Sequence, residues 1–247
     1  MTTSQDAPPV LDSALLRATL RQELRAAWLH IRDSHAPDGL YGFGVYTTPS
    51  ASYLNVTAFS ERGLDEVVAA YVREYGEGGR SAKVRQAALK RGGRPDDPGL
   101  LRRSLRWSPC DSPLHAVGAE LLARSDKVIQ AADFEGRWAD DDDLDDDEFD
   151  EACETPDPDV QEVFRIVVEE LQRLDREGLF GTGTERQGFV LSVWQGDQSN
   201  LSRHAFAKML NPPETAARFG REMNDQVLAH TLAFHGEKAL PELDVFE

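Results

Sequence analysis

The sequence predicts an α+β fold in which a small, mainly antiparallel sheet of three to five strands packs with five or six helices. Apolar residues recur at helical spacing in several long segments. Two strand-like runs, residues 41–47 and 52–60, flank a short turn at 48–51 and predict a hairpin. The hairpin argues against a purely parallel, doubly wound sheet.

The helical pattern is clearest near the middle of the chain, where seven apolar residues fall on one helical face. They are Val160, Val163, Phe164, Val167, Val168, Leu171 and Leu174. Helices are also expected at residues 11–33, 61–75, 113–132 and 214–234, with a short one inside 80–99. A buried strand is expected at 188–194 and a short one near Leu105 and Trp107.

The first strand run has an unusual face. Tyr41, Phe43 and Val45 alternate with Gly42 and Gly44, so the large side chains are expected on one face and the glycines on the other. A strand face without side chains allows a helix or another backbone to approach closely.

Length and composition predict one soluble domain spanning residues 1–247. Cysteine is scarce, which is unlike a secreted disulfide scaffold. The first ten residues lack the pattern of a signal peptide. The longest apolar run has six residues, whereas a membrane span needs about 20. We therefore expect a cytoplasmic protein that does not enter a membrane.

The formal net charge of −17 is unevenly distributed. Thirteen acidic residues and no lysine or arginine lie between Trp138 and Asp159, whereas residues 80–106 hold nine Lys and Arg against two Asp. The acid excess repels nucleic acids and anionic membranes. The pattern predicts a solvated, mobile insertion at 138–159. Two alternatives are an arm that docks on a basic protein and an arm that folds back on residues 80–106.

The candidate partner-binding residues all lie in this acidic segment, where a few apolar side chains interrupt the charge. They are Trp138, Asp140, Asp141, Asp142, Asp143, Leu144, Asp145, Asp146, Asp147, Glu148, Phe149, Asp150 and Glu151. The tryptophan, leucine and phenylalanine are the candidate apolar anchors. A calcium-binding loop is not expected, because the run has no glycine for the required turn.

No catalytic, cofactor or metal motif stands out. The paired histidines are five residues apart, so they diverge on a helix and cannot share a metal ion. The glycine clusters fit neither a dinucleotide fingerprint nor a P-loop. Cys110 and His115 would suit a thiol nucleophile and its base, but a surface cysteine is the favoured interpretation. Glu169 and Glu170 are expected to face solvent.

Three stretches together resemble the bacterial domain-of-unknown-function family 4303. They are residues 41–46 with 59–64, residues 106–109, and Asp197 with residues 208–212. Within them, Phe59-Ser60-Glu61 stands where the family has an Asn-Thr-Glu-like turn, and Asp111-Ser112-Pro113 replaces the family's second Trp. The resemblance covers most of residues 11–213, and the acidic segment has no part in it.

The resemblance implies no established activity. The bacterial members of the family, however, resemble the small acidic immunity proteins that block the toxins of bacterial toxin systems. We therefore expect a non-enzymatic binding protein, of the immunity or adaptor type, that engages a basic protein such as a toxin and needs no cofactor or metal. The alternative is an enzyme whose dispersed site includes Trp107, Asp197, His204 and Asn211. A third hypothesis is a homo-oligomer that pairs the basic and acidic segments between copies.

Overall fold

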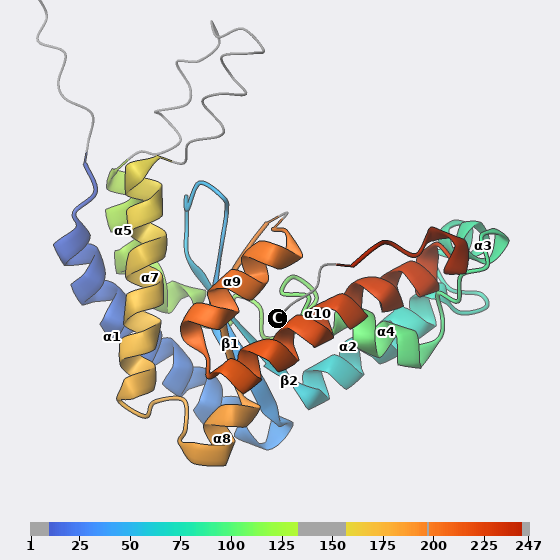
Figure 1. Ribbon diagram of the computed structural model, residues 1–247, viewed down its shortest axis with the longest axis horizontal. Helices are drawn as coiled ribbons and strands as arrows, with labels where there is room; N and C mark the ends of the chain where they lie inside the picture. Colours follow the sequence, from blue (N-terminus) through green and yellow to red (C-terminus); the bar gives the residue numbers. More distant parts are fainter. Residues whose placement is uncertain (1–9, 133–156, 197, 244–247) are drawn as a thin grey trace, which may run out of the picture.

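The computed structural model describes residues 10–132, 157–196 and 198–243 (Figure 1). These residues form three strands and nine α-helices. The strands are β1 (Leu40–Thr47), β2 (Asn55–Ser60) and β3 (Val190–Gln195). The helices are α1 (Ser13–His35), α2 (Glu61–Tyr75), α3 (Ala82–Lys90), α4 (Pro98–Leu105), α5 (Ala123–Ala131), α7 (Pro158–Arg176), α8 (Gly183–Gly188), α9 (Asn200–Leu210) and α10 (Pro213–Phe234). Short 3₁₀ helices cover Ala36–Asp38, Ala119–Leu122 and Glu237–Ala239.

The α+β prediction is confirmed, with a sheet at the low end of the expected strand number. The strand order is β2-β1-β3. The expected hairpin is present, since β1 pairs antiparallel with β2, but β1 pairs parallel with β3, so the sheet is mixed. The helices outnumber the expected five or six because α4, α8 and α9, each of 11 residues or fewer, were not anticipated. None of the described helices is long and apolar enough to cross a membrane.

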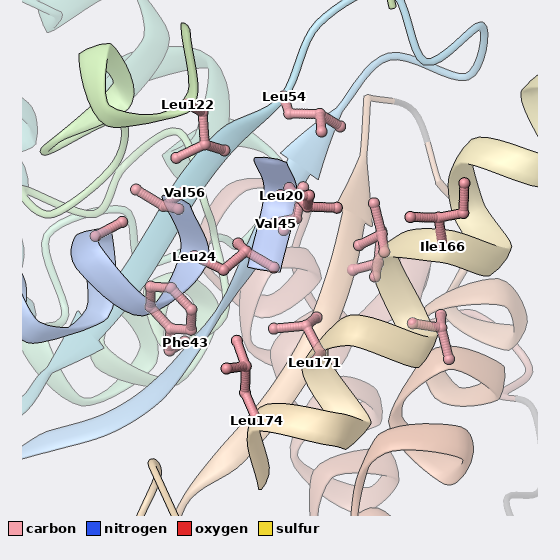
Figure 2. Close-up of a cluster of buried hydrophobic side chains, with 14 of the residues drawn as sticks. Leu20, Leu24, Phe43, Val45, Leu54, Val56, Leu122, Ile166, Leu171 and Leu174 are labelled. Carbon is pink, nitrogen blue, oxygen red and sulfur yellow. The ribbon is translucent and has the colours of Figure 1, made fainter. Parts of the chain in front are cut away.

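Helices cover both faces of the sheet (Figure 1). On one face, α1, α5 and α7 enclose a large apolar core that includes Phe43 and Val45 of β1 (Figure 2). On the other face, α9 and α10 pack over a smaller cluster rich in aromatic side chains, which we call the aromatic core. Its members are Tyr41, Phe59, Trp107, Val190, Trp194, Ala207, Phe219 and Met223.

The glycine face of β1 makes the aromatic core possible. A Cβ atom on Gly42 would lie 2.8 Å from the Trp107 ring, and one on Gly44 would lie 2.6 Å from the Trp194 ring. On Gly44 it would also lie 1.8 Å from the Ser192 carbonyl oxygen. The close approach expected at these glycines is therefore made by two tryptophans and the neighbouring strand.

Tyr41 does not share a face with Phe43 and Val45, which corrects the sequence prediction. The pairing of β1 with β2 shifts between Leu40 and Gly42. Such an irregularity breaks the simple alternation of faces. Tyr41 consequently turns into the aromatic core, where its ring centroid lies 5.0 Å from that of Trp107.

Two other sequence predictions change because tertiary contacts intervene. The expected helix at 113–132 begins only at the 3₁₀ turn Ala119–Leu122, because the preceding residues run beside β2. There the Ala116 amide donates to the Val56 carbonyl at 2.9 Å, and the Ala58 amide donates to the Leu114 carbonyl at 3.3 Å. The short strand expected near Leu105 is instead the C-terminal end of α4. This helix begins after Asp97, whose side chain caps its N-terminus.

Glu170 is buried, although the sequence predicts that it faces solvent. Its side chain is 3% exposed and binds Arg21, whose Nε lies 2.6 Å from Glu170 Oε2. The adjacent Glu169 binds Arg17 and Arg165 and is 40% exposed. Ion pairs to carboxylates thus join α1 to α7 beside their apolar stripes.

Gly44→Ala is expected to destabilise the protein by about 3 kcal/mol or to prevent folding, because overpacking of this size forces backbone shifts. Urea unfolding of the variant measures the change in unfolding free energy. Gly188→Ala is the matched control, because nothing lies within 4 Å of its added Cβ. The control should change the free energy by less than about 0.5 kcal/mol. Equal effects of the two substitutions would contradict the packing argument.

Glu170→Ala is expected to cost about 2 to 3 kcal/mol of unfolding free energy, because Arg21 loses its partner in a partly buried site. Glu169→Ala, one residue away and more exposed, should cost less than about 1 kcal/mol. Thermal or urea unfolding of both variants tests this order. A larger loss from the Glu169 variant would show that the buried carboxylate is not the stabilising one.

Candidate functional site

The structure contains a cavity of about 460 Å³ that is lined mainly by helices. Its walls come from α2, α3, α4, α9 and α10 and from the loop after α4. The volume falls in the range of small-molecule sites. Its lining combines aromatic and aliphatic side chains with a few polar ones, so we call it the polar pocket and treat it as the candidate functional site.

The α4 and α10 walls are held together by apolar and polar contacts. Leu100 of α4 packs with Ala229 and Ala233 of α10. Arg103 Nη1 donates to Asp225 Oδ1 at 2.8 Å, and Gln226 Nε2 donates to the Ser104 carbonyl at 2.9 Å. These contacts fix the polar residues of α10 over the pocket.

The loop after α4 contributes a hydrogen-bonded carboxylate. Tyr71 Oη and Ser108 Oγ each donate to Asp111, at 2.5 Å from its two oxygens. Burial, followed by the hydrogen bond to Asp111, raises the pKa of Tyr71. The Tyr71 hydroxyl therefore stays protonated and keeps donating to Asp111.

His230 forms part of the α10 wall. Its Nδ1 lies 3.4 Å from Ser104 Oγ, and its ring centroid lies 6.0 Å from that of His235. Burial, followed by the charge of His235, lowers the pKa of His230. The imidazole is therefore neutral near pH 7 and can act as a donor or an acceptor.

Arg203 and Asn200 form the α9 wall. The Arg203 guanidinium is near the phenol of Tyr46 and the thiol of Cys110. Burial lowers the pKa of Arg203, and its Nε is buried without a hydrogen-bond partner. No carboxylate of the described residues forms an ion pair with it.

Cys110 and His115 do not form a hydrogen-bonded thiol–imidazole pair in the structure. Cys110 is exposed, and its Sγ donates to Tyr46 Oη at 3.7 Å. His115 Nδ1 instead lies 2.8 Å from Thr57 Oγ1, and the His115 ring packs edge-on against Tyr46. Burial lowers the pKa of His115.

Within the described residues, no group of three or more His, Cys, Asp and Glu could hold a metal ion.

Three residues of the alternative enzyme hypothesis, Trp107, His204 and Asn211, are described, and none of the three lines the polar pocket. Trp107 is 1% exposed, and its indole donates to Glu222 Oε2 at 2.8 Å. Asn211 caps α9 and bonds both the amide and the carbonyl of Leu191. His204 is buried on α9, and Asp197 lies outside the described residues.

The predicted partner-binding residues also lie outside the described part of the chain, since they all fall within 138–151. The last residues of the predicted acidic insertion are described, however, and they begin α7. The Asp157 side chain accepts from the Asp159 amide as the helix cap. Pro158 stands at the first helical positions, where its missing N–H costs nothing.

The sequence does not predict the polar pocket, because none of its lining residues belongs to a recognisable sequence motif. Ser199 does cap α9, accepting from the Ser202 amide at 3.2 Å, and a serine before an apolar pattern is a recognisable signal. Only His204, Ala207 and Leu210 of α9 are buried, so the apolar stripe is too sparse to predict the helix. Nothing local distinguishes Arg203 from a surface arginine.

The pKa of His230 predicts a pH effect on stability. Because the folded pKa is below the unfolded value of 6.5, the unfolded state binds protons more strongly. The stabilisation is therefore complete above pH 6.5 and is lost as the pH falls through the folded pKa. His230→Gln should reduce this loss in urea unfolding between about pH 7 and 5. An unchanged pH profile would contradict the assignment.

Comparison with known proteins identifies the family but no function. No curated protein and no solved structure matches the chain. One family model matches residues 20–212, which include α9 and end just before α10, so the α10 wall of the pocket lies beyond the match. Since the match covers more than half of the chain, this protein belongs to the family described as Domain of unknown function (DUF4303), as its sequence motifs predict.

Proposed function

We propose that this chain is a non-enzymatic binding protein, of the immunity or adaptor type, that engages a basic protein through its acidic segment (residues 138–159). The observation that carries the proposal is the partition of charge. Residues outside the described part hold seventeen acidic residues and one arginine. The described residues therefore carry a formal charge of only −1, so nearly all of the −17 belongs to residues outside the described part of the chain.

Five of the nine basic residues at 80–106 form ion pairs with acidic residues of the described fold. Arg102 binds Glu61 and Asp65, and Arg106 Nη1 lies 3.0 Å from Glu61 Oε1. Further ion pairs join Arg85 to Asp96, Arg94 to Asp97 and Arg103 to Asp225. These pairs leave fewer cations for the acidic segment, which supports a partner over the alternative of folding back.

The helix ends beside the acidic segment also offer few cations. Both α5, which precedes it, and α7, which follows it, pack on α1. Arg124 of α5 binds Glu23, and Arg165 of α7 binds Glu162 and Glu169. The described residues of α5 and of the first two turns of α7 include three basic side chains. Of these three, only Lys127 forms no ion pair within the described part of the chain.

A concentrated negative charge suits a partner of opposite charge. Complementary charge mainly accelerates association and selects the partner, while apolar anchors contribute affinity. Leu144 and Phe149 are the anchors available inside the run of acids. The enzyme alternative has less support, because Trp107 and Asn211 are held in structural hydrogen bonds.

The proposal is tested with full-length protein as bait in native lysate, followed by purification of the captured protein and calorimetry. Replacing Asp140, Asp141, Asp142 and Asp143 by Asn should weaken binding at least about tenfold and reduce its salt dependence. The matched control replaces Glu77, Glu214, Glu237 and Glu242, four exposed acids of the described fold, by Gln.

The control variant should bind like the wild type, although it loses the same net charge. Deletion of residues 139–154 should abolish capture of the partner. Capture that survives this deletion, or equal weakening by both sets of four substitutions, would refute binding through the acidic segment. An acidic partner would refute the charge argument.

A further inference from the structure

The polar pocket contains a cation, Arg203, that has no counterion among the described residues. Within the described chain, Arg203 is the only lysine or arginine that lines it. The guanidinium stays charged at any physiological pH, because even a lowered arginine pKa remains far above 7. A charge that is partly removed from water is costly unless an anion or strong hydrogen bonds compensate it.

Other shielded arginines of the fold show how this protein normally meets that requirement. Arg186 is 7% exposed, and its guanidinium binds Asp175, two backbone carbonyls and Asn211. Arg106 binds Glu61 and Glu222 and lies over the Tyr41 ring. Arg203 instead has a buried Nε with no partner, beside a phenol and a thiol.

A second unsatisfied polar group belongs to the same pocket. Gln226 donates its amide to the Ser104 carbonyl, but its Oε1 is buried without a hydrogen-bond partner. Asn200, in the first turn of α9, and His230 add polar groups able to donate hydrogen bonds. An unsatisfied cation and an unsatisfied amide on facing helices are typical of a binding site rather than of a packed core.

The rest of the lining sets the character of the ligand. Tyr75, Leu105, Val227 and Phe234 form an apolar wall, and the Tyr75 and Phe234 rings lie 5.2 Å apart in an edge-to-face arrangement. The Asp111 carboxylate also lines the pocket, but both of its oxygens already accept hydrogen bonds from Tyr71 and Ser108. The pocket therefore offers a free positive charge together with apolar surface.

We propose that the polar pocket binds a small organic anion, a carboxylate or phosphate monoester carried on an apolar body. Arg203 pairs with the anionic group, which guanidinium geometry suits for both carboxylate and phosphate. Asn200 and Gln226 orient the polar end of the ligand. Tyr75 and Phe234 cover the apolar body. This site is separate from the acidic segment, so it does not depend on the proposed function.

Binding is measured on the full-length protein by calorimetry and by amide chemical-shift changes, with phenylacetate and phenyl phosphate as probes. Phenylacetamide tests the need for charge, and inorganic phosphate tests the need for the apolar body. We expect at least one aromatic anion to bind at least about tenfold tighter than both comparison compounds. The tighter of the two aromatic anions identifies the head group. Shift changes should centre on α9 and α10.

Arg203→Met should abolish the binding and leave the melting temperature equal or higher, because an uncompensated charge is removed. Arg221→Met is the control, since Arg221 is exposed on α10 and lines none of this pocket. The control should bind like the wild type.

Three results would overturn the proposal. They are no binding of either aromatic anion up to about 10 mM, equal binding by the Arg203 variant, and shift changes away from α9 and α10. A large fall in the melting temperature of Arg203→Met would also count against it, because it would assign Arg203 a structural role.

Discussion

The two bare glycines of β1 are the constraint on which the rest of the structure depends. β1 is the central strand, paired on both edges, and helices cover both of its faces. Gly42 and Gly44 leave room for Trp107 and Trp194 against the backbone. Trp107 then binds Glu222 of α10 through its indole. This contact fixes the loop after α4 against α10, and so shapes one end of the polar pocket.

Charge within the fold is organised so that most arginines have an acidic partner. The arginines of α4 bind acids of α2 and α10, and those of α1 bind acids of α7. Such networks orient helices while leaving the fold near neutrality. The protein therefore separates its electrostatic features, with a strong negative charge outside the described fold and a single unpaired guanidinium at the polar pocket. The two features suit different ligands, since one attracts cations and the other anions.

Much of the fold was predictable, whereas the candidate site was not. Apolar periodicity predicted α1, α2, α7 and α10, because a buried helix face imposes that period on the sequence. Two strand-like runs around a short turn predicted β1 and β2, and an apolar, partly β-branched run predicted β3. Arg203, Gln226 and His230 were not singled out for the pocket. What makes Arg203 informative is the absence of an acidic partner among its described neighbours. That property depends on which side chains surround it in space, so it cannot be read from local sequence.

The sequence by itself determined the periodic elements, the glycine face of β1, the family and the location of the acid excess, because each is encoded in neighbouring residues. Tertiary structure decided that β3 joins parallel to β1, that Tyr41 turns into the aromatic core, and that the residues before Ala119 run beside β2 instead of forming a helix. It also decided that Arg203 has no counterion in the part of the chain that the structure describes. These outcomes depend on contacts between segments far apart in the chain, whose free energies exceed local preferences.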